Sequence, residues 1–343
     1  RRRELATACG ADVVVDPARG TLSVIDDGVG MTADEVDRYL NEIAFSGAAD
    51  FVSRHQEATG EHVIGQFGVG FYSAFMIADR VEVDTLSCSL DAVAAQWVCG
   101  SDMAFRLGPG SRAEVGTTVT LHLDPASPYL AGPEPTLAAL RRHTPFLPIP
   151  VHVTVRAGDG SGVDNATSIL ANDAAPVWRR AATGPVDDAE LNAFYREHFA
   201  DEFDPLLTIP VASLELGLRG VIFVRDTRGG QREVDGHVDV LRRGITIGRD
   251  VPGLVPKYLE VQSVILECDA LPLVASRGGI RDADLPEGVP DLVRESLTQS
   301  VLLRLYGMFT EERERYEALW PEIGPFVKYG ALTDRTFSSV MAR

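Results

Sequence analysis

Two glycine clusters hold the residues of this sequence that are best suited to binding an anion. The first spans residues 26–31 (DDGVGM), and the second spans residues 65–71 (GQFGVGF). Glycine tolerates backbone conformations that other residues avoid, and it lets the main chain approach a ligand closely. A helical pattern follows each cluster, and the free N–H groups at a helix start suit phosphates. The pair predicts a phosphate-binding site, although each cluster alone is also typical of a tight turn or a helix entry.

The spacing of these glycines excludes two common nucleotide-binding motifs. No G-x-x-x-x-G-K-[ST] segment occurs in the chain, so a P-loop is excluded. The first cluster lacks the third glycine and the strand–helix–strand setting of a dinucleotide-binding fingerprint. A nucleotide site here would therefore combine the two clusters.

A predicted hairpin and a capped helix flank the first cluster. Residues 11–16 and 21–26 are β-rich and are joined by a turn that contains Pro and Gly, which predicts the hairpin. Thr32 and Glu35 fit a capping box at the start of the helix. The apolar positions of this helix recur with helical spacing at Val36, Tyr39, Leu40 and Ile43, ahead of Gly47. Residues 48–63 are polar and irregular, which predicts a loop between the two clusters.

Helices followed by a run of strands favour an α+β sandwich over a doubly wound βαβ fold. The strand-like runs lie at residues 81–85, 94–98, 104–107, 117–123, 151–155, 213–218, 221–224, 238–247 and 261–268. Later helical patterns lie near residues 137–143, at residues 187–199 and at Val293, Leu297, Val301 and Leu305. A stretch rich in proline and acid predicts two domains, residues 1–128 and 137–343, joined by a linker at residues 129–136.

Composition narrows the possible functions. The chain has 343 residues, of which 45% are hydrophobic and 24% are charged, as in ordinary globular proteins. Its formal net charge of -18 argues against nucleic acid and anionic membranes as partners. The 4 cysteines and 7 histidines are scattered, so we assign no metal ligands. No apolar run is long enough to cross a bilayer, and we expect a cytoplasmic protein with reduced thiols.

Taken together, these segments resemble the split-box ATP site of the GHKL superfamily, which includes gyrases, histidine kinases, mismatch-repair proteins and heat-shock-protein-90 chaperones. Residues 26–31 match the first glycine box, and residues 65–74 match the second box in the form peculiar to the heat-shock-protein-90 family. Residues 43–47 are similar to the segment that opens the family's lid, and residues 116–123 to the strand that closes its pocket. The segments that are similar to the family's middle domain are residues 142–149, 176–178 and 271–277.

The resemblance covers nearly the whole chain and implies a fold and a set of site residues. A Bergerat-type (GHKL) α/β sandwich would bind ATP, and a mixed α/β middle domain similar to domain 2 of ribosomal protein S5 would follow it. Asp26 would anchor adenine by accepting a hydrogen bond from its exocyclic amine. The other implied nucleotide-binding positions are Gly28, Gly30, Met31, Gly65, Gly68, Val69, Gly70, Phe71 and Thr117. Arg277 would be the catalytic residue, acting on the terminal phosphate from the middle domain.

The sequence departs from the family pattern at places that matter for hydrolysis. The family's helix with a general-base Glu and a magnesium-binding Asn would precede Ala11 and does not occur there. The family's C-terminal dimerisation domain is also missing, so we expect a chain that is incomplete at both ends. Phe45 stands where many members carry a Lys that lies near the phosphates. Tyr39 stands where an Asn is usual, and Arg281 stands where a Gln is frequent. These departures leave ATP hydrolysis by this chain open.

One hypothesis and two alternatives follow from these features. The resemblance implies an ATP-dependent chaperone that uses ATP and Mg²⁺, acts on client proteins and forms a homodimer at full length. ATP would close residues 48–63 over the nucleotide, and its hydrolysis would reset the molecule. Phe45 and the missing carboxylate leave open a non-hydrolysing nucleotide sensor or scaffold on the same fold. The second alternative is a DNA-acting GHKL ATPase, which the net charge of -18 disfavours.

Overall fold

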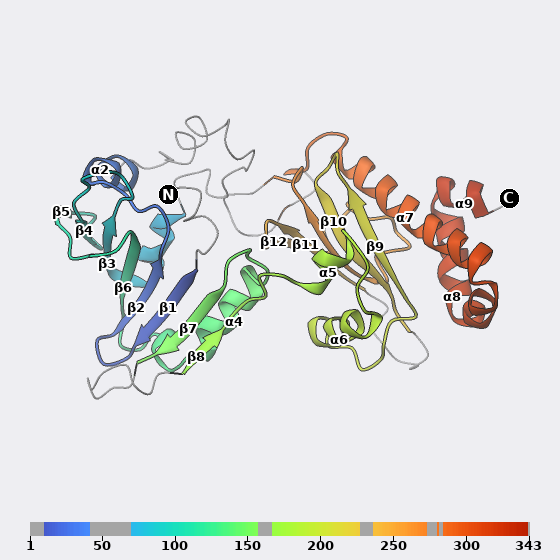
Figure 1. Cartoon of the computed structure of the whole chain (residues 1–343), viewed down its shortest axis with the longest axis horizontal. Coiled ribbons are helices and arrows are strands. Elements are labelled where there is room, and N and C mark those ends of the chain that lie inside the picture. The colour runs from blue at the N-terminus through green and yellow to red at the C-terminus, as the bar shows by residue number, and fades with distance from the viewer. Residues whose placement is uncertain are drawn as a thin grey trace. The chain divides into compact units, whose positions relative to one another are not determined.

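The chain folds into two compact units, Arg1–Ala174 and Ala175–Arg343. The structure is a computed structural model that describes residues 10–41, 70–156, 167–226, 236–272, 280 and 284–341. Each unit has its own sheet and its own hydrophobic core (Figure 1). Antiparallel pairing predominates in both sheets, and helices pack on them, which confirms the α+β class that the sequence predicted.

An eight-stranded sheet is the centre of the first unit as described, with the order β5-β4-β3-β6-β2-β1-β7-β8. Its strands are β1 (Ala11–Asp16), β2 (Thr21–Asp26), β3 (Ala78–Leu86), β4 (Ala95–Gly100), β5 (Phe105–Pro109), β6 (Gly116–Leu123), β7 (Val151–Val155) and β8 (Ser168–Leu170). The neighbouring strands run antiparallel, except that β1 and β7 run parallel. The order places β2, β6 and β3 side by side, so the end of β2 lies next to two strands that come much later in the chain.

The predicted hairpin and capped helix are both present in this unit. β1 and β2 form the hairpin, with Asp16 paired to Thr21 across the turn. Its helical elements are α2 (Ala33–Leu40), η1 (Phe71–Met76), η2 (Pro128–Leu130) and α4 (Glu134–His143). Thr32 and Glu35 exchange both hydrogen bonds of a capping box at the start of α2. The buried face of α2, with Val36, packs into the core of the sheet.

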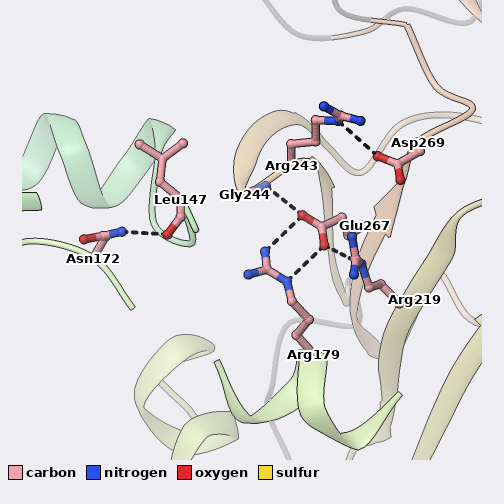
Figure 2. Close-up of polar contacts among 8 residues, drawn as sticks. All are labelled: Leu147, Asn172, Arg179, Arg219, Arg243, Gly244, Glu267 and Asp269. Carbon is pink, nitrogen blue, oxygen red and sulfur yellow. Dashed lines mark hydrogen bonds and ion pairs between the residues drawn. The ribbon is translucent and has the colours of Figure 1, made fainter. Parts of the chain in front are cut away.

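The division into units falls later in the chain than the linker that we predicted at residues 129–136. The described residues 134–156 and 167–172 belong to the first unit because β7 pairs with β1 and extends its sheet. The buried Asn172 side chain then donates to the Leu147 carbonyl (Figure 2). It also donates to the Ile149 carbonyl, and the two bonds fasten the chain before β7. The assignment of residues 129–136 as a linker stays a prediction.

The second unit is built on a five-stranded sheet, as far as the structure describes it, with the order β12-β11-β13-β10-β9. Its strands are β9 (Leu207–Ser213), β10 (Leu218–Val224), β11 (His237–Arg242), β12 (Ile245–Arg249) and β13 (Ser263–Cys268), and its helices are α5 (Val177–Ala181), α6 (Asp188–His198), α7 (Val289–Glu311), α8 (Arg313–Thr333) and α9 (Arg335–Met341). Side chains alternate along β10: Ile222 joins the core that α7 covers, whereas Phe223 packs on Tyr195 of α6. α7 lies between the sheet and the pair of α8 and α9 (Figure 1).

Two strand predictions in this unit are wrong, for the same reason. Residues 213–218 contain the turn between β9 and β10, where Leu214 is fully exposed and Gly217 has a φ of +55°. Residues 238–247 contain β11, a turn and the start of β12, and Arg243 in that turn has a φ of +51°. The first turn occupies residues 214–217 and the second only residues 243–244, so each is short enough to be hidden in a run of β-rich residues.

Candidate functional site

The first glycine cluster forms a turn at the end of β2, next to the start of β6 and the end of β3. Asp26, the last residue of β2, is half-buried, and its Oδ1 accepts a hydrogen bond of 2.9 Å from the Gly28 N–H. Among the described residues this N–H is the partner of the carboxylate, so Oδ2 remains an available acceptor. Asp26 therefore combines a fixed orientation with a free oxygen.

Gly30 lies closer to the end of β3 than any other residue type could. Its φ is +62°, and a Cβ at this position would lie 1.9 Å from the Leu86 carbonyl oxygen. The next N–H in the chain, that of Met31, donates a hydrogen bond of 2.9 Å to Thr85 Oγ1. Both the backbone conformation and the contact require glycine here, because a side chain would push the turn away from β3.

Gly116 makes a second close approach, at the start of β6. Its φ is +131°, and a Cβ there would lie 2.2 Å from the Asp26 carbonyl oxygen. The Arg112 guanidinium donates to the same carbonyl at 3.3 Å and to Thr118 Oγ1 at 2.6 Å. Arg112 thereby connects the loop before β6 to the end of β2. In these contacts its guanidinium donates to uncharged carbonyl and hydroxyl oxygens.

Thr117 stands between Asp26 and Thr85 in a row that crosses three strands. It pairs directly with Asp26 across β2 and β6, and with Thr85 across β6 and β3. Residues directly opposite each other in antiparallel strands project from the same face of the sheet. The Thr117 and Thr85 hydroxyl oxygens are 3.0 Å apart, and both residues are buried. The structure thus brings Asp26 and Thr117 together on one face.

Two residues of the second cluster lie at the start of the short helix η1: Gly70 is its N-cap and Phe71 is its first residue. The Phe71 ring packs edge-on against Trp97, with 5.5 Å between ring centroids. The next residue, Tyr72, donates from its hydroxyl to the Leu40 carbonyl at the end of α2, at 2.8 Å. Burial raises the pKa of the Tyr72 hydroxyl, so it remains a donor at neutral pH. These contacts fasten the end of the second glycine cluster to α2.

The remaining predicted site residues fall into two groups. Met31 is partly buried and packs against the core of the first unit. Gly65, Gly68, Val69 and Arg277 lie outside the described residues, as do Phe45, Arg281 and the predicted loop at residues 48–63. Their roles stay predictions.

Thr85 and Arg112 contact predicted site residues although the sequence did not single them out. Thr85 lies in an ordinary alternating strand, and its partner Met31 is 54 positions away in the chain. Arg112 contacts the Asp26 carbonyl across 86 positions. No local pattern reports contacts at such separations, so only the pairing of β3 with β6 and β2 reveals them.

In the second unit, a buried carboxylate joins the sheet to α5. Glu267 of β13 accepts from Arg179 at 3.1 and 3.0 Å, forms an ion pair of 2.8 Å with Arg219 and accepts from the Gly244 N–H at 2.7 Å (Figure 2). The Glu267 side chain is only 1% exposed. Its oxygens are fully used by these partners, so the cluster anchors β13 and the β11–β12 turn rather than offering a site to a ligand.

A second charged cluster in this unit surrounds Asp239 of β11. His198 donates to it at 2.7 Å, and the Arg249 Nε lies 3.0 Å from its other oxygen. Burial favours the neutral acid, but the hydrogen bond from His198 and the charges of His198, Arg249 and His237 lower the pKa of the Asp239 carboxyl. The ring of His198 also stacks on Phe194. This cluster links α6 to the sheet.

A groove of about 690 Å³ in the second unit contains none of the predicted site residues. Several of its polar side chains serve the fold: Arg294 pairs with Asp291, and Asp334 accepts from Thr298 and from the backbone at the start of α9. The described ranges hold no group of three or more His, Cys, Asp or Glu side chains arranged for a metal ion. Nor does any helix in them have the length and apolar character needed to span a membrane.

Comparison with known proteins decides the family. The family model described as "Hsp90 protein" matches residues 163–343, more than half of the chain. The chain belongs to the Hsp90 family. A second model, described as "Histidine kinase-, DNA gyrase B-, and HSP90-like ATPase", matches residues 5–99, which include both glycine clusters. The resemblance that the motifs indicated is therefore confirmed.

Individual relatives agree with this assignment to the Hsp90 family. Chaperone protein HtpG of Porphyromonas gingivalis is 30% identical over 331 residues, which cover 95% of this chain and 47% of that protein. HtpG of Bacteroides fragilis is 28% identical over 328 residues, covering 95% and 47%. HtpG of Cronobacter sakazakii is 28% identical over 340 residues, covering 96% and 53%. The chain spans about half the length of these curated relatives.

Proposed function

We propose that this chain binds ATP in its first unit and that the whole protein is an ATP-dependent chaperone of the Hsp90 type. The observation that carries the proposal is the free Oδ2 of Asp26, held beside Thr117 on one face by a turn that only glycine can form. The unit that holds this arrangement contains the segment matched by the HSP90-like ATPase model. We further propose client proteins as its targets, a homodimer as its assembly and the cytoplasm as its location.

The residues of the first unit would divide the work of binding. Asp26 would accept a hydrogen bond from the exocyclic amine of adenine, and Thr117 and Gly30 would assist, in part through water. Met31 would pack on the base. The backbone N–H groups of residues 68–71, which follow Gly65 in the second cluster, would bind the phosphates. This set suits adenine, because Asp26 offers an acceptor to the amino group of the base and the glycine turn lets the backbone approach the base closely.

Arg277 would carry the catalytic step from the second unit. A guanidinium there would stabilise negative charge that develops on the terminal phosphate. When bound, Mg²⁺ would neutralise phosphate charge, and we assign no residue of this chain to it. β13, which the Glu267 cluster anchors, ends at Cys268 and leads into the segment with Arg277. A fixed strand end would help to place that arginine.

One observation favours a second function, a non-hydrolysing nucleotide sensor or scaffold on the same fold. Phe45 stands where many Hsp90 proteins carry a Lys, and an aromatic ring cannot supply that positive charge. Such a protein would bind ATP and change its conformation without releasing phosphate. The DNA-acting alternative has the less support, since a net charge of -18 repels a phosphate backbone.

Single-turnover phosphate release from the full-length protein separates these functions. We expect the wild type to release phosphate, and Arg277→Ala to bind ATP with unchanged affinity while releasing phosphate about a hundredfold more slowly. Arg335→Ala, an exposed arginine in the same unit, is the matched control and should keep the wild-type rate. ATP binding without phosphate release would establish the sensor, and a full rate in Arg277→Ala would remove that residue from catalysis.

A further inference from the structure

Asp26, Thr117 and Thr85 lie side by side on three strands, and the hydrogen bonds around Thr85 could not be predicted from the local sequence. Thr85 is fully buried at the end of β3, and three polar groups surround its Oγ1. The Met31 N–H lies at 2.9 Å, the Gly116 carbonyl oxygen at 3.1 Å and Thr117 Oγ1 at 3.0 Å. Thr85 thus connects the glycine turn to both of its neighbouring strands through one oxygen atom.

Counting protons fixes the direction of each bond. A threonine hydroxyl has one proton to donate and two lone pairs to accept with. The Met31 N–H can only donate, so Thr85 accepts from it, and the Gly116 carbonyl can only accept, so Thr85 donates to it. Thr85 then has no proton left for Thr117, and the Thr117 hydroxyl must donate to Thr85. This is the one arrangement in which all three contacts are hydrogen bonds.

The consequence is that Thr117 can offer a ligand only lone pairs. Its proton is committed to Thr85, and no other described group contacts its hydroxyl. The free Oδ2 of its neighbour Asp26 is also an acceptor. Two acceptors on one face suit a group with two N–H donors, directly or through a water molecule. The amino group at position 6 of adenine is such a group, whereas the oxygen at position 6 of guanine or inosine is an acceptor.

We propose that Thr85 is a specificity-determining positioning residue: it holds the Thr117 hydroxyl as an acceptor and thereby selects 6-amino purines over 6-oxo purines. The inference rests on the proposed nucleotide site and adds to it the residue that sets the polarity of the base contact. Thr85 does not touch the base. It acts through the proton of Thr117, which would otherwise be free to turn toward a 6-oxo group.

The test compares two nucleotides in three proteins. Equilibrium dissociation constants for ATP and inosine triphosphate are measured calorimetrically for the wild type, Thr85→Val and Thr85→Ser. Valine has the shape of threonine without its hydroxyl, so Thr117 regains a free proton, and we expect the preference for ATP over inosine triphosphate to fall about tenfold. Serine keeps the hydroxyl and should keep the wild-type preference.

A merely structural function of Thr85 would give a different result. Loss of the bond to the Met31 N–H would then weaken the binding of ATP and of inosine triphosphate by the same factor. An unchanged preference for ATP in Thr85→Val would therefore overturn the proposal. Loss of the preference in Thr85→Ser would overturn it as well. If Thr85→Val does not fold, Thr117→Val takes its place in the test. This variant removes the acceptor hydroxyl of Thr117 and keeps the bonds of Thr85 to the Met31 N–H and the Gly116 carbonyl. Its preference should fall likewise, and an unchanged preference would contradict the proposal.

Failure of the nucleotide site itself would look different again. A wild-type chain that binds neither nucleotide would overturn both proposals. A wild type that prefers ATP, together with a Thr85→Val variant of equal preference, would leave the site standing and remove only the role of Thr85.

Discussion

The two units hold their chemically important segments by different means. In the first unit, neutral groups do most of the holding: Thr85 joins the glycine turn to β3 and β6, and the charge of Arg112 is spent on carbonyl and hydroxyl oxygens. In the second unit, buried ion pairs hold the segments together, because the carboxylate of Glu267 lies between Arg179 and Arg219.

This difference separates the proposed nucleotide site, where a carboxylate oxygen is left for a ligand, from a structural anchor whose carboxylate oxygens all have partners. Because neutral groups hold the glycine turn, Asp26 uses only Oδ1 within the described structure, and its charged Oδ2 can accept a hydrogen bond from a ligand. The Glu267 carboxylate has a partner on each oxygen, so nothing is left to recognise. The first site should therefore respond most to changes of backbone shape, and the second to changes of charge.

Neutralising Glu267 should produce the largest effect. Glu267→Gln keeps a hydrogen-bond acceptor but removes the negative charge that faces the mostly buried Arg179, which should cost about 3 kcal/mol of unfolding free energy. Arg219 is 38% exposed, so solvent screens its ion pair with Glu267 and this pair contributes less to the loss. Urea unfolding followed by hydrogen exchange of peptides from β13 and α5 measures the loss in the second unit.

The control for this variant is Glu190→Gln, which removes an exposed ion pair with Arg180 in the same unit. Its effect should be about 0.5 kcal/mol or less. Equal losses in the two variants would show that burial does not give the Glu267 cluster its importance.

Changing the backbone of the glycine turn should produce the next largest effect. Gly30→Ala must either abandon a φ of +62° or displace the Leu86 carbonyl, which should cost about 2 kcal/mol and loosen the turn. Hydrogen exchange of residues 26–32 should rise, and ATP affinity should fall. Gly108→Ala, at a position with open space and no positive φ, is the matched control and should leave both unchanged. Protection of the turn in Gly30→Ala at the wild-type level would contradict the close packing described here.

Acid should weaken the Asp239 cluster, and this effect should be the smallest. Because the folded pKa of Asp239 is lowered, its contribution to stability is complete above the pKa of an unfolded aspartate, about 3.9, and disappears as the pH falls through the lower folded value. The difference in unfolding free energy between the wild type and Asp239→Asn should therefore shrink between pH 5 and pH 2.5. A difference that grows toward low pH would reverse the sign of this linkage.

Local patterns predicted much of the fold and supplied the candidate residues of the site. The capping box of Thr32 and Glu35 and the hairpin of β1 and β2 depend on neighbours in the chain, and both form as predicted. The contacts that complete the site could not be predicted in this way. Thr85 reaches Met31, and Arg112 reaches the Asp26 carbonyl, only because the sheet brings β3 and β6 beside β2.

The most direct test of the account is the affinity of Asp26→Asn for ATP. Asparagine can keep the bond from the Gly28 N–H, but it places an N–H₂ donor where the free oxygen stood, opposite the amino group of adenine. Asp27→Asn, one residue along and exposed, is the control. Calorimetric titration should show ATP bound at least about tenfold more weakly by Asp26→Asn and as tightly as the wild type by Asp27→Asn. Equal affinity of Asp26→Asn and the wild type would contradict the recognition of adenine by this carboxylate.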